Sequence, residues 1–415
     1  MESVVKTGEK YWWKEINRNQ WMTLAAGMAG WGLDGFDVML YVFALTTILN
    51  EWGLTTTSAG FLTSVTLFSS AIGGILFGII ADKIGRKKSL MLTIFIFSIC
   101  SGLSGLAQNM VQLAIARILL GIGMGGEWGT GALIVAESWP PEHRGKAIGF
   151  MQSGWAIGYI LAALAATFIL PIWGWRVLFF IGILPALATV WIRSYVKEPE
   201  IWVEEQKKDE KKQNSLIQIF KPDLIKYTIL VSLVGSCVLF AYWGLFSWLP
   251  GFLSTPIEKG GAGLSVAKSS AWMIPTMLGA FFGYISFGFI SDKFGRRPTF
   301  AAYLVLSAIL VYVYGNTRDA AMLILLGPFV GFFGSGYFSA FGAMISELYP
   351  TRARGAGVGF TYNVGRMASA LAPTVIGYAA TIHGLGGSLT ITALFFLLGA
   401  MAIFLLPETK AKELV

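Results

Sequence analysis

Five ionisable side chains lie inside long apolar stretches of this sequence, where a charge is costly. They are Asp34, Asp37, Arg117, Glu127 and Arg366. Charged residues in such places face a partner charge or a water-filled cavity, and they mark the routes of protons and charged solutes. These five residues are therefore the first candidates for chemistry in this chain.

The two aspartates are close together in the run WGLDGFD. Residues three apart lie near each other on a helix, and two close carboxylates disfavour double ionisation, so one of them is expected to hold a proton. We expect Asp34, the deeper of the two, to be a proton carrier, with Asp37 as the alternative. The alternative to a proton carrier is a purely structural role. In that case one carboxylate pairs with a cation or accepts backbone hydrogen bonds and only holds its helix in place.

Arg117 and Glu127 belong to one predicted helix with the sequence ARILLGIGMGGEWG. They are about 15 Å apart along it at 1.5 Å per residue, and the glycines between them allow a neighbouring helix to approach closely. Arg117 either controls the protonation of Asp34 or Asp37, or forms a static pair between the first and fourth helices. Glu127 either relays a proton or pairs with an arginine of the loops.

Arg366 is about midway along another apolar stretch, in YNVGRMAS. The only acidic residue within an apolar stretch of the same half of the chain is Glu347, near one end of its stretch. A guanidinium matches a carboxylate through two parallel hydrogen bonds, so we expect Arg366 to bind the carboxylate of an anionic ligand. The alternative is a long-range pair with one of the three acids named above.

Other side chains are expected to complete a ligand site around Arg366. Tyr362 and Asn363 precede it by one turn, and Tyr337 is on the preceding predicted helix. Trp243 belongs to the aromatic run FAYWGLF, a kind of sequence that more often packs helices together than stacks on a ligand.

Composition places these residues in a membrane. The 415 residues are 55% hydrophobic and 13% charged, with a mean hydropathy of +0.65, which excludes a soluble enzyme. Apolar runs of about twenty residues, enough to span a bilayer as helices, occur twelve times. We therefore predict an all-α membrane protein with twelve transmembrane helices. They begin near Trp21, Ser58, Ser89, Met110, Gly145, Trp175, Lys226, Val266, Thr299, Ala320, Gly355 and Gly386.

The basic residues indicate the orientation of these helices. Of the 31 lysines and arginines, 25 fall in the terminal segments and in the loops on the same side of the membrane. The positive-inside rule then predicts cytoplasmic N- and C-termini in the cell membrane. The net charge of +8 is thereby explained by topology, and no nucleic-acid partner is expected.

An internal repeat divides the chain. The segment GIIADKIGRKK at 78–88 matches GFISDKFGRRP at 288–298, and ESWPPEHRG at 137–145 matches ELYPTRARG at 347–355, both with an offset of 210. Two halves with even numbers of spans run parallel, related by an axis along the membrane normal. The predicted organisation is a cytoplasmic segment 1–20, a six-helix bundle 21–195, a cytoplasmic linker 196–225, a second six-helix bundle 226–406 and a tail 407–415.

The motif Gly-x-x-x-Asp-x-x-Gly-Arg-Arg/Lys in both halves, the twelve spans and the long central segment resemble the major facilitator superfamily of secondary transporters. The resemblance runs from Trp21 to Thr409. It implies alternating access, in which the two halves rock about a site in mid-membrane. It also implies that loop charges form a cytoplasmic latch of ion pairs, although topology with tight glycine turns is the simpler explanation. The latch residues are Asp82, Arg86, Glu137 and Arg144, repeated as Asp292, Arg296, Glu347 and Arg354.

Within the superfamily, the runs DGFDVMLYVFAL, GGEWG, ESWP and IWGWRVLFFIGILPAL resemble most the proton symporters of sialate, lactate and related monocarboxylates. The aromatic-acid proton symporters share the DGFD run, and the dicarboxylate symporters share GGEWG. The resemblance implies import of a small organic anion such as lactate, pyruvate or sialate together with protons, by a carrier that is a monomer. A proton cancels the charge of the anion, so the loaded carrier moves no net charge through the membrane.

Two alternatives of other classes remain, a proton-driven drug exporter and a transport-inactive sensor. Arg366 argues against cationic drugs. No phosphate-binding loop followed by Lys-Ser/Thr occurs, so ATP is not expected to drive transport. His143 and His383 are in loops at opposite membrane sides, so no metal site and no cofactor are expected.

Overall fold

The computed structural model of the chain describes residues 14–198, 203, 215–339, 344–345, 348–349 and 351–409. In this part of the chain, nine helical stretches are long and apolar enough to cross a membrane, and the shorter Ala320–Gly336 is also apolar. Two of the nine, Lys146–Ile181 and Ala356–Leu405, contain a glycine with non-helical backbone angles at which the chain turns back. Each of these two therefore belongs to two spans, and with Ala320–Gly336 as a further span the predicted twelve are confirmed.

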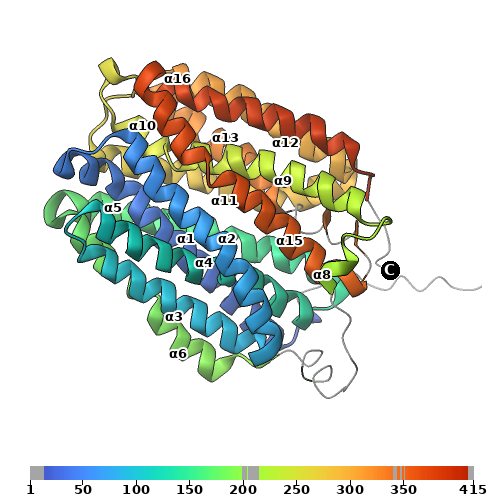
Figure 1. Cartoon of the computed structure of the whole chain (residues 1–415). Coiled ribbons are helices and arrows are strands. Elements are labelled where there is room, and N and C mark those ends of the chain that lie inside the picture. Colours follow the sequence, from blue (N-terminus) through green and yellow to red (C-terminus); the bar gives the residue numbers. More distant parts are fainter. Residues whose placement is uncertain are drawn as a thin grey trace, which may run out of the picture.

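The helices of the two halves run side by side in Figure 1, the first half in blue to green and the second in yellow to red. The first half comprises α1 (Arg18–Trp52), α2 (Thr56–Ile84), α3 (Arg86–Gly105), α4 (Met110–Ser138), α5 (Pro141–Ile181) and α6 (Ala186–Tyr195). The second comprises α8 (Ser215–Gln218), α9 (Ile225–Phe246), α10 (Leu249–Ser254), η2 (Ile257–Lys259), α11 (Val266–Phe294), α12 (Arg296–Asn316), α13 (Ala320–Gly336), α15 (Thr351–Ser369), α16 (Ala372–Ala402) and η3 (Ile403–Leu405). We call the end where α1 begins and α16 ends the terminal end, and the opposite end the distal end.

The repeat with an offset of 210 extends to the capping residues of the helices. Thr55 caps α2 and Ser265 caps α11, and Asn109 caps α4 and Asp319 caps α13. In each case the side-chain oxygen accepts the backbone N–H three residues further on, which satisfies a donor that the helix leaves free. The two halves thus begin these helices by the same local chemistry.

Glycines with positive φ form the sharp turns at repeat-related positions. Gly85 between α2 and α3 has φ 106°, and Gly295 between α11 and α12 has φ 102°. Gly174 within α5 and Gly384 within α16 have φ 74° and 71°. Residues with a Cβ rarely adopt such angles, so glycine is required at these turns.

Two glutamates, also 210 residues apart, close the starts of α3 and α12. Glu198 accepts the backbone N–H of Lys87 at 3.1 Å. Glu408 accepts the N–H groups of Arg296 and Arg297 at 2.8 and 3.1 Å. A carboxylate at a helix N-terminus pairs with free donors and with the positive end of the helix dipole. Each half therefore ties its last span to its motif loop.

Close helix packing depends on glycine within the first half. A Cβ added to Gly125 of α4 would collide with the carbonyl oxygen of Ser70 on α2, and one on Gly158 of α5 with that of Gly32 on α1. Small residues let transmembrane helices approach and gain van der Waals contact. Cys100 and Cys237 are buried and free.

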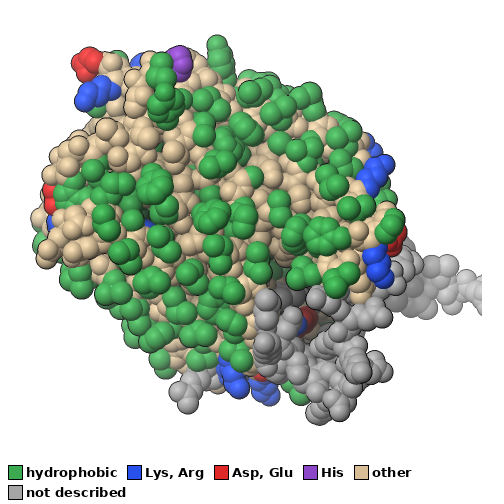
Figure 2. Space-filling model, viewed as in Figure 1, with side chains coloured by type: hydrophobic (Ala, Val, Ile, Leu, Met, Phe, Trp, Pro, Cys, Tyr) green, Lys and Arg blue, Asp and Glu red, His purple; other side chains and the backbone are tan. Residues whose placement is uncertain are grey.

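The surface has the pattern of a membrane protein. In Figure 2 hydrophobic side chains cover the middle of the visible face, and charged ones gather toward the two ends of the helices. Since lipid is as apolar as these side chains, their exposure has no cost in a bilayer.

The two halves are joined near the distal end by hydrogen bonds of small hydroxyl side chains. They are Thr56 Oγ1 to the carbonyl oxygen of Gly377 at 2.8 Å, Ser64 with Thr374 at 2.7 Å, and Thr46 with Ser254 at 3.4 Å. We call these three the distal contacts. They connect α1 and α2 of the first half with α10 and α16 of the second.

Candidate functional site

All five intramembrane charges predicted from the sequence are buried. The three acids are 0% exposed, and the two arginines are 1% exposed. Within the described part of the chain, no carboxylate oxygen of these acids has a hydrogen-bond partner, and none of the five belongs to an ion pair within 4.0 Å. Buried charges without direct partners are unfavourable in a fold that serves only its own stability. They indicate a site that a ligand, water or a proton completes.

The first group of charges surrounds Arg117 on α4. Its guanidinium lies 4.8 Å from the ring centroid of Tyr41 on α1 and 4.5 Å from that of Phe179 on α5, so the cation is held between two aromatic faces. Asp37 interacts electrostatically with Arg117. Ser101 of α3 also lies beside Asp37, since both side chains border Gly182. Arg117 is therefore placed next to Asp37, one of the two aspartates left open by the sequence.

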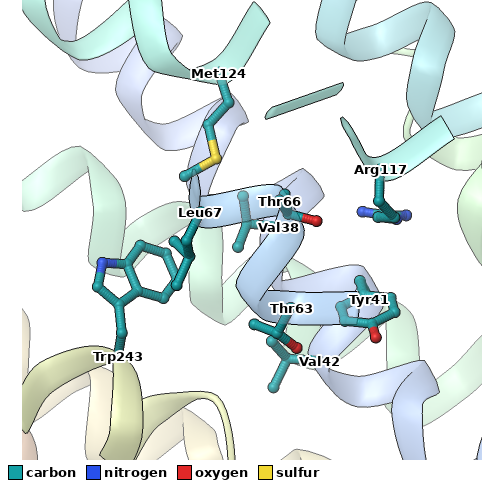
Figure 3. Close-up of a pocket in the computed structure, with 9 residues that line it drawn as sticks. All are labelled: Val38, Tyr41, Val42, Thr63, Thr66, Leu67, Arg117, Met124 and Trp243. Carbon is teal, nitrogen blue, oxygen red and sulfur yellow. The ribbon is translucent and has the colours of Figure 1, made fainter. Parts of the chain in front are cut away.

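A small pocket adjoins this group (Figure 3). Figure 3 shows Arg117 and Trp243 on opposite sides of it. Because Trp243 comes from α9 and the other lining residues from the first half, the pocket lies where the halves meet. It is lined by Val38, Tyr41, Val42, Thr63, Thr66, Leu67, Arg117, Met124 and Trp243.

The second group of charges surrounds Arg366 on α15. Asp34 and Glu127, both of the first half, interact electrostatically with Arg366 and with each other. The Glu127 carboxylate packs against Gly30, one helical turn before Asp34 on α1. The structure therefore places Glu127 near Asp34 and Arg366. The long-range pairing considered for Arg366 is thus an electrostatic interaction, and among the described residues no direct ion pair within 4.0 Å is formed.

Aromatic and amide side chains from both halves lie beside this second group of charges. The ring of Tyr362 lies 5.3 Å from the Arg366 guanidinium and stacks on Trp128 of α4 with centroids 4.0 Å apart. Trp128 donates its indole N–H to Gln152 at 3.1 Å. Asn363 donates to the carbonyl of its own helix, and its Oδ1 has no hydrogen-bond partner. Tyr362 and Asn363 therefore lie at the junction of the halves, as a shared site requires.

The remaining predicted ligand residues are buried nearby in an aromatic cluster. Trp243 packs edge-on against Trp155 at 5.9 Å, and the hydroxyl of Tyr337 donates to the carbonyl of Val238 at 3.3 Å. The Tyr242 hydroxyl and the Trp155 indole N–H are buried and, among the described residues, neither forms a hydrogen bond within 3.5 Å. Trp128, Trp155 and Gln152 were not predicted from the sequence. The only available signal was the GGEWG run, which places Trp128 directly after Glu127.

Of the eight predicted latch residues, the structure describes the side chains of Arg86, Glu137 and Arg296. Arg86 forms two hydrogen bonds to the carboxylate of Glu137, both 3.2 Å, and it also donates to the carbonyl of Ala81. Arg296 donates to Ser291 Oγ at 2.6 Å. Glu347 lies outside the described residues, and so do the side chains of Asp82, Arg144, Asp292 and Arg354.

The intramembrane charges are not part of the repeat. With the offset of 210, each charged position of one half corresponds to an uncharged residue of the other. The pairs are Asp34 with Gly244, Asp37 with Ser247, Arg117 with Gly327, Glu127 with Tyr337, and Arg366 with Ala156. The scaffold is therefore duplicated, whereas its charges are specific to one half.

A comparison with known families identifies the class of protein that this fold and site define. The family model described as the Major Facilitator Superfamily matches residues 27–286 and 254–414. The chain belongs to this superfamily of membrane transporters and is not an enzyme.

Individual relatives agree with this assignment. The chain is 34% identical to the sialic acid transporter NanX of Escherichia coli (strain K12), over 93% of each chain. It is 32% identical to the cis,cis-muconate transport protein of Acinetobacter baylyi, over 91% of this chain and 92% of that one. Among solved structures, a D-xylose-proton symporter has a TM-score of 0.75 at 20% identity, over 96% of this chain and 100% of that one, which shows the common fold.

Proposed function

We propose that this protein imports a small organic acid together with protons by alternating access. The acid is a monocarboxylate such as lactate, pyruvate or sialate, with aromatic acids and dicarboxylates as the alternative cargo. The observation that carries the proposal is Arg366, a buried guanidinium whose Nε and Nη2 have no hydrogen-bond partner within the described part of the chain.

A substrate carboxylate would satisfy those free donors. Arg366 contributes a planar pair of donors, Tyr362 an aromatic face beside it, and Asn363 an unpaired amide oxygen. These groups come from α15, and Asn363 and Tyr362 face α2 and α4 of the other half. The names of two relatives, which carry sialic acid and muconate, support an acidic cargo.

Protons supply the driving force in this proposal. Asp34, Asp37 and Glu127 are carboxylates buried without hydrogen bonds among the described residues, and intramembrane acids of this kind mark proton relays in transporters. Arg117 stands next to Asp37 and controls its ionisation. The gradient of protons then replaces ATP as the energy source.

The proposed transport cycle uses the two ends of the bundle as alternating gates. With both termini in the cytoplasm, the distal contacts close the outer side, and they part when the outer side opens. The Arg86 and Glu137 pair then belongs to the cytoplasmic latch of the first half. In a site shielded from water such a pair is strong enough to bias two states, and it weakens when water enters.

Uptake by the purified protein in liposomes tests the proposal. Labelled lactate, pyruvate, sialate, benzoate and citrate are offered with the inside alkaline, and we expect at least one acid to accumulate. The accumulation should collapse when an ionophore dissipates the pH gradient. If an acid accumulates to the same level without the pH gradient, the proposed coupling to protons is wrong. If none of the acids accumulates, the proposed class of substrate is wrong.

A further inference from the structure

We infer that Asp34 and Glu127 share the single guanidinium of Arg366, so that each arriving substrate carboxylate releases one carboxylate from it and one proton is taken up. The inference rests on the proposed function and adds one statement to it. Coupling is a property of the pair of acids and not of one residue, and this pair keeps the uptake of a monocarboxylate electroneutral.

The argument begins with the buried charges of the described spans. Three acids face two arginines, and Asp37 belongs with Arg117. Asp34 and Glu127 are left with Arg366 as their cation. A carboxylate buried without a cation is strongly unfavourable, so one acid of the pair is ionised opposite Arg366 and the other holds a proton.

Substrate binding changes this balance by one charge. When the substrate carboxylate occupies the guanidinium, neither Asp34 nor Glu127 retains a cation. The ionised acid therefore takes up one proton and becomes neutral. The group formed by Asp34, Glu127, Arg366 and the bound monoanion then has no net charge, as it had before binding. Release of the substrate reverses the step and returns the proton.

The geometry supports a shared site. The Glu127 carboxylate packs against Gly30, one turn from Asp34, so α1 and α4 present both acids from the first half. Arg366 enters from α15 of the other half, and its approach depends on how the halves meet. The other titratable groups that act on the pair or its arginine are Asp37 on α1 and Tyr362 on α15, and Arg117 on α4 acts on Asp37.

The electrical balance of the wild type is the first test. In liposomes loaded with the protein, labelled benzoate and sialate, both monoanions, should accumulate about tenfold per unit of pH gradient, because one pH unit is a tenfold ratio of protons. A potassium and valinomycin potential without a pH gradient should drive no accumulation. Accumulation driven by that potential would overturn the inference while leaving proton-coupled uptake intact.

Neutral variants of the two acids are the second test. Asp34→Asn and Glu127→Gln should each still accumulate benzoate or sialate with a pH gradient, because the remaining acid pairs with Arg366. The double variant should lose this accumulation, keep exchange of labelled for unlabelled acid, and respond to the imposed potential. Glu258→Gln, an exposed acid of η2, is the control for loss of a carboxylate elsewhere.

The single variants keep the inference testable if the double variant does not fold. If one single variant abolishes accumulation while the other equals the wild type, the acids do not share the site. If the wild type accumulates neither acid nor any other of the panel, the proposed function itself fails.

Discussion

Arg117 and Arg366 are both buried, but their surroundings differ. Arg117 lies between the rings of Tyr41 and Phe179 and has a carboxylate nearby within its own half. Arg366 has one ring beside it, and both acids that act on it come from the opposite half. A movement between the halves changes the environment of Arg366 far more than that of Arg117. This difference favours Arg366 as the ligand site and Arg117 as a supporting cation.

A glycine substitution tests the helix packing at the residue scale. Gly125→Ala should destabilise the protein, by about 1 to 3 kcal/mol as for other overpacked positions, because its Cβ would meet backbone atoms of Ser70 and Gly74. Gly129→Ala, one turn further on the same helix, has open space and is the matched control. Thermal unfolding in detergent measures both. Equal melting temperatures would show that α2 and α4 are not packed this closely.

At the residue scale, the sequence predicted which charged side chains are buried but not which side chains lie beside them. Burial followed from the apolar run around each charge, which is a local property. The position of Glu127 near Asp34 and Arg366 depends on how α1, α4 and α15 meet, and these three helices are far apart in the chain. The loop-arginine alternative for Glu127 was reasonable from its position alone, and among the described residues Glu127 packs on Gly30 of α1.

At the scale of elements, repeat-related caps and turns set where the helices start and stop. Hydrophobic length predicted the twelve spans, including the reversals that the structure places at Gly174 and Gly384. The capping roles of Glu198 and Glu408 were not predicted. Both glutamates lie in short polar segments. Charged residues are common there, so the sequence does not indicate which groups these glutamates bind.

Removing the capping carboxylates tests this role. Glu198→Gln and Glu408→Gln should each lower the stability by about 1 kcal/mol, the usual effect of losing a helix cap. The reason is that the charged acceptor at the start of α3 or α12 becomes a neutral one. Melting temperatures measured beside Glu258→Gln separate this effect from loss of a surface charge. A larger effect in Glu258→Gln would contradict the capping role.

The pair of Arg86 and Glu137 belongs to the same scale, because it ties the start of α3 to the end of α4. Arg86→Lys keeps the charge but loses the two-pronged geometry. We expect turnover to slow and single cysteines placed near Glu137 to become more accessible from the terminal end. Unchanged accessibility and turnover would leave Arg86 with a role in topology only.

At the scale of the whole molecule, the distal contacts hold α2 against α16. Gly60→Val should keep the halves apart there, because the side chain would collide with the carbonyl of Pro373. Distances between spin labels on the distal ends of α2 and α16 should lengthen. Gly78→Val, on the same helix with nothing near its Cβ, is the control. Identical distance distributions in both variants would contradict this gate.

The duplicated scaffold was predictable because the loop motif and the helix lengths recur at a fixed offset. The relation between the halves was not, since no sequence pattern states which residues of α1 and α4 meet α15. The site lies at that junction, so Arg366 was predictable from the sequence but Trp128 on the facing helix was not.

Binding by Arg366 variants tests the central claim most directly. Affinity for the best transported acid and for its uncharged amide is measured in the wild type, Arg366→Lys and Arg366→Ala. Arg366→Lys should weaken binding of the acid by about 1 to 3 kcal/mol, the range for hydrogen bonds to charged groups, and Arg366→Ala by more. The wild type should reject the amide, and Arg366→Ala should discriminate far less. If Arg366→Ala binds the acid as tightly as the wild type and keeps its preference over the amide, the carboxylate site is elsewhere, and Arg117 is the next candidate.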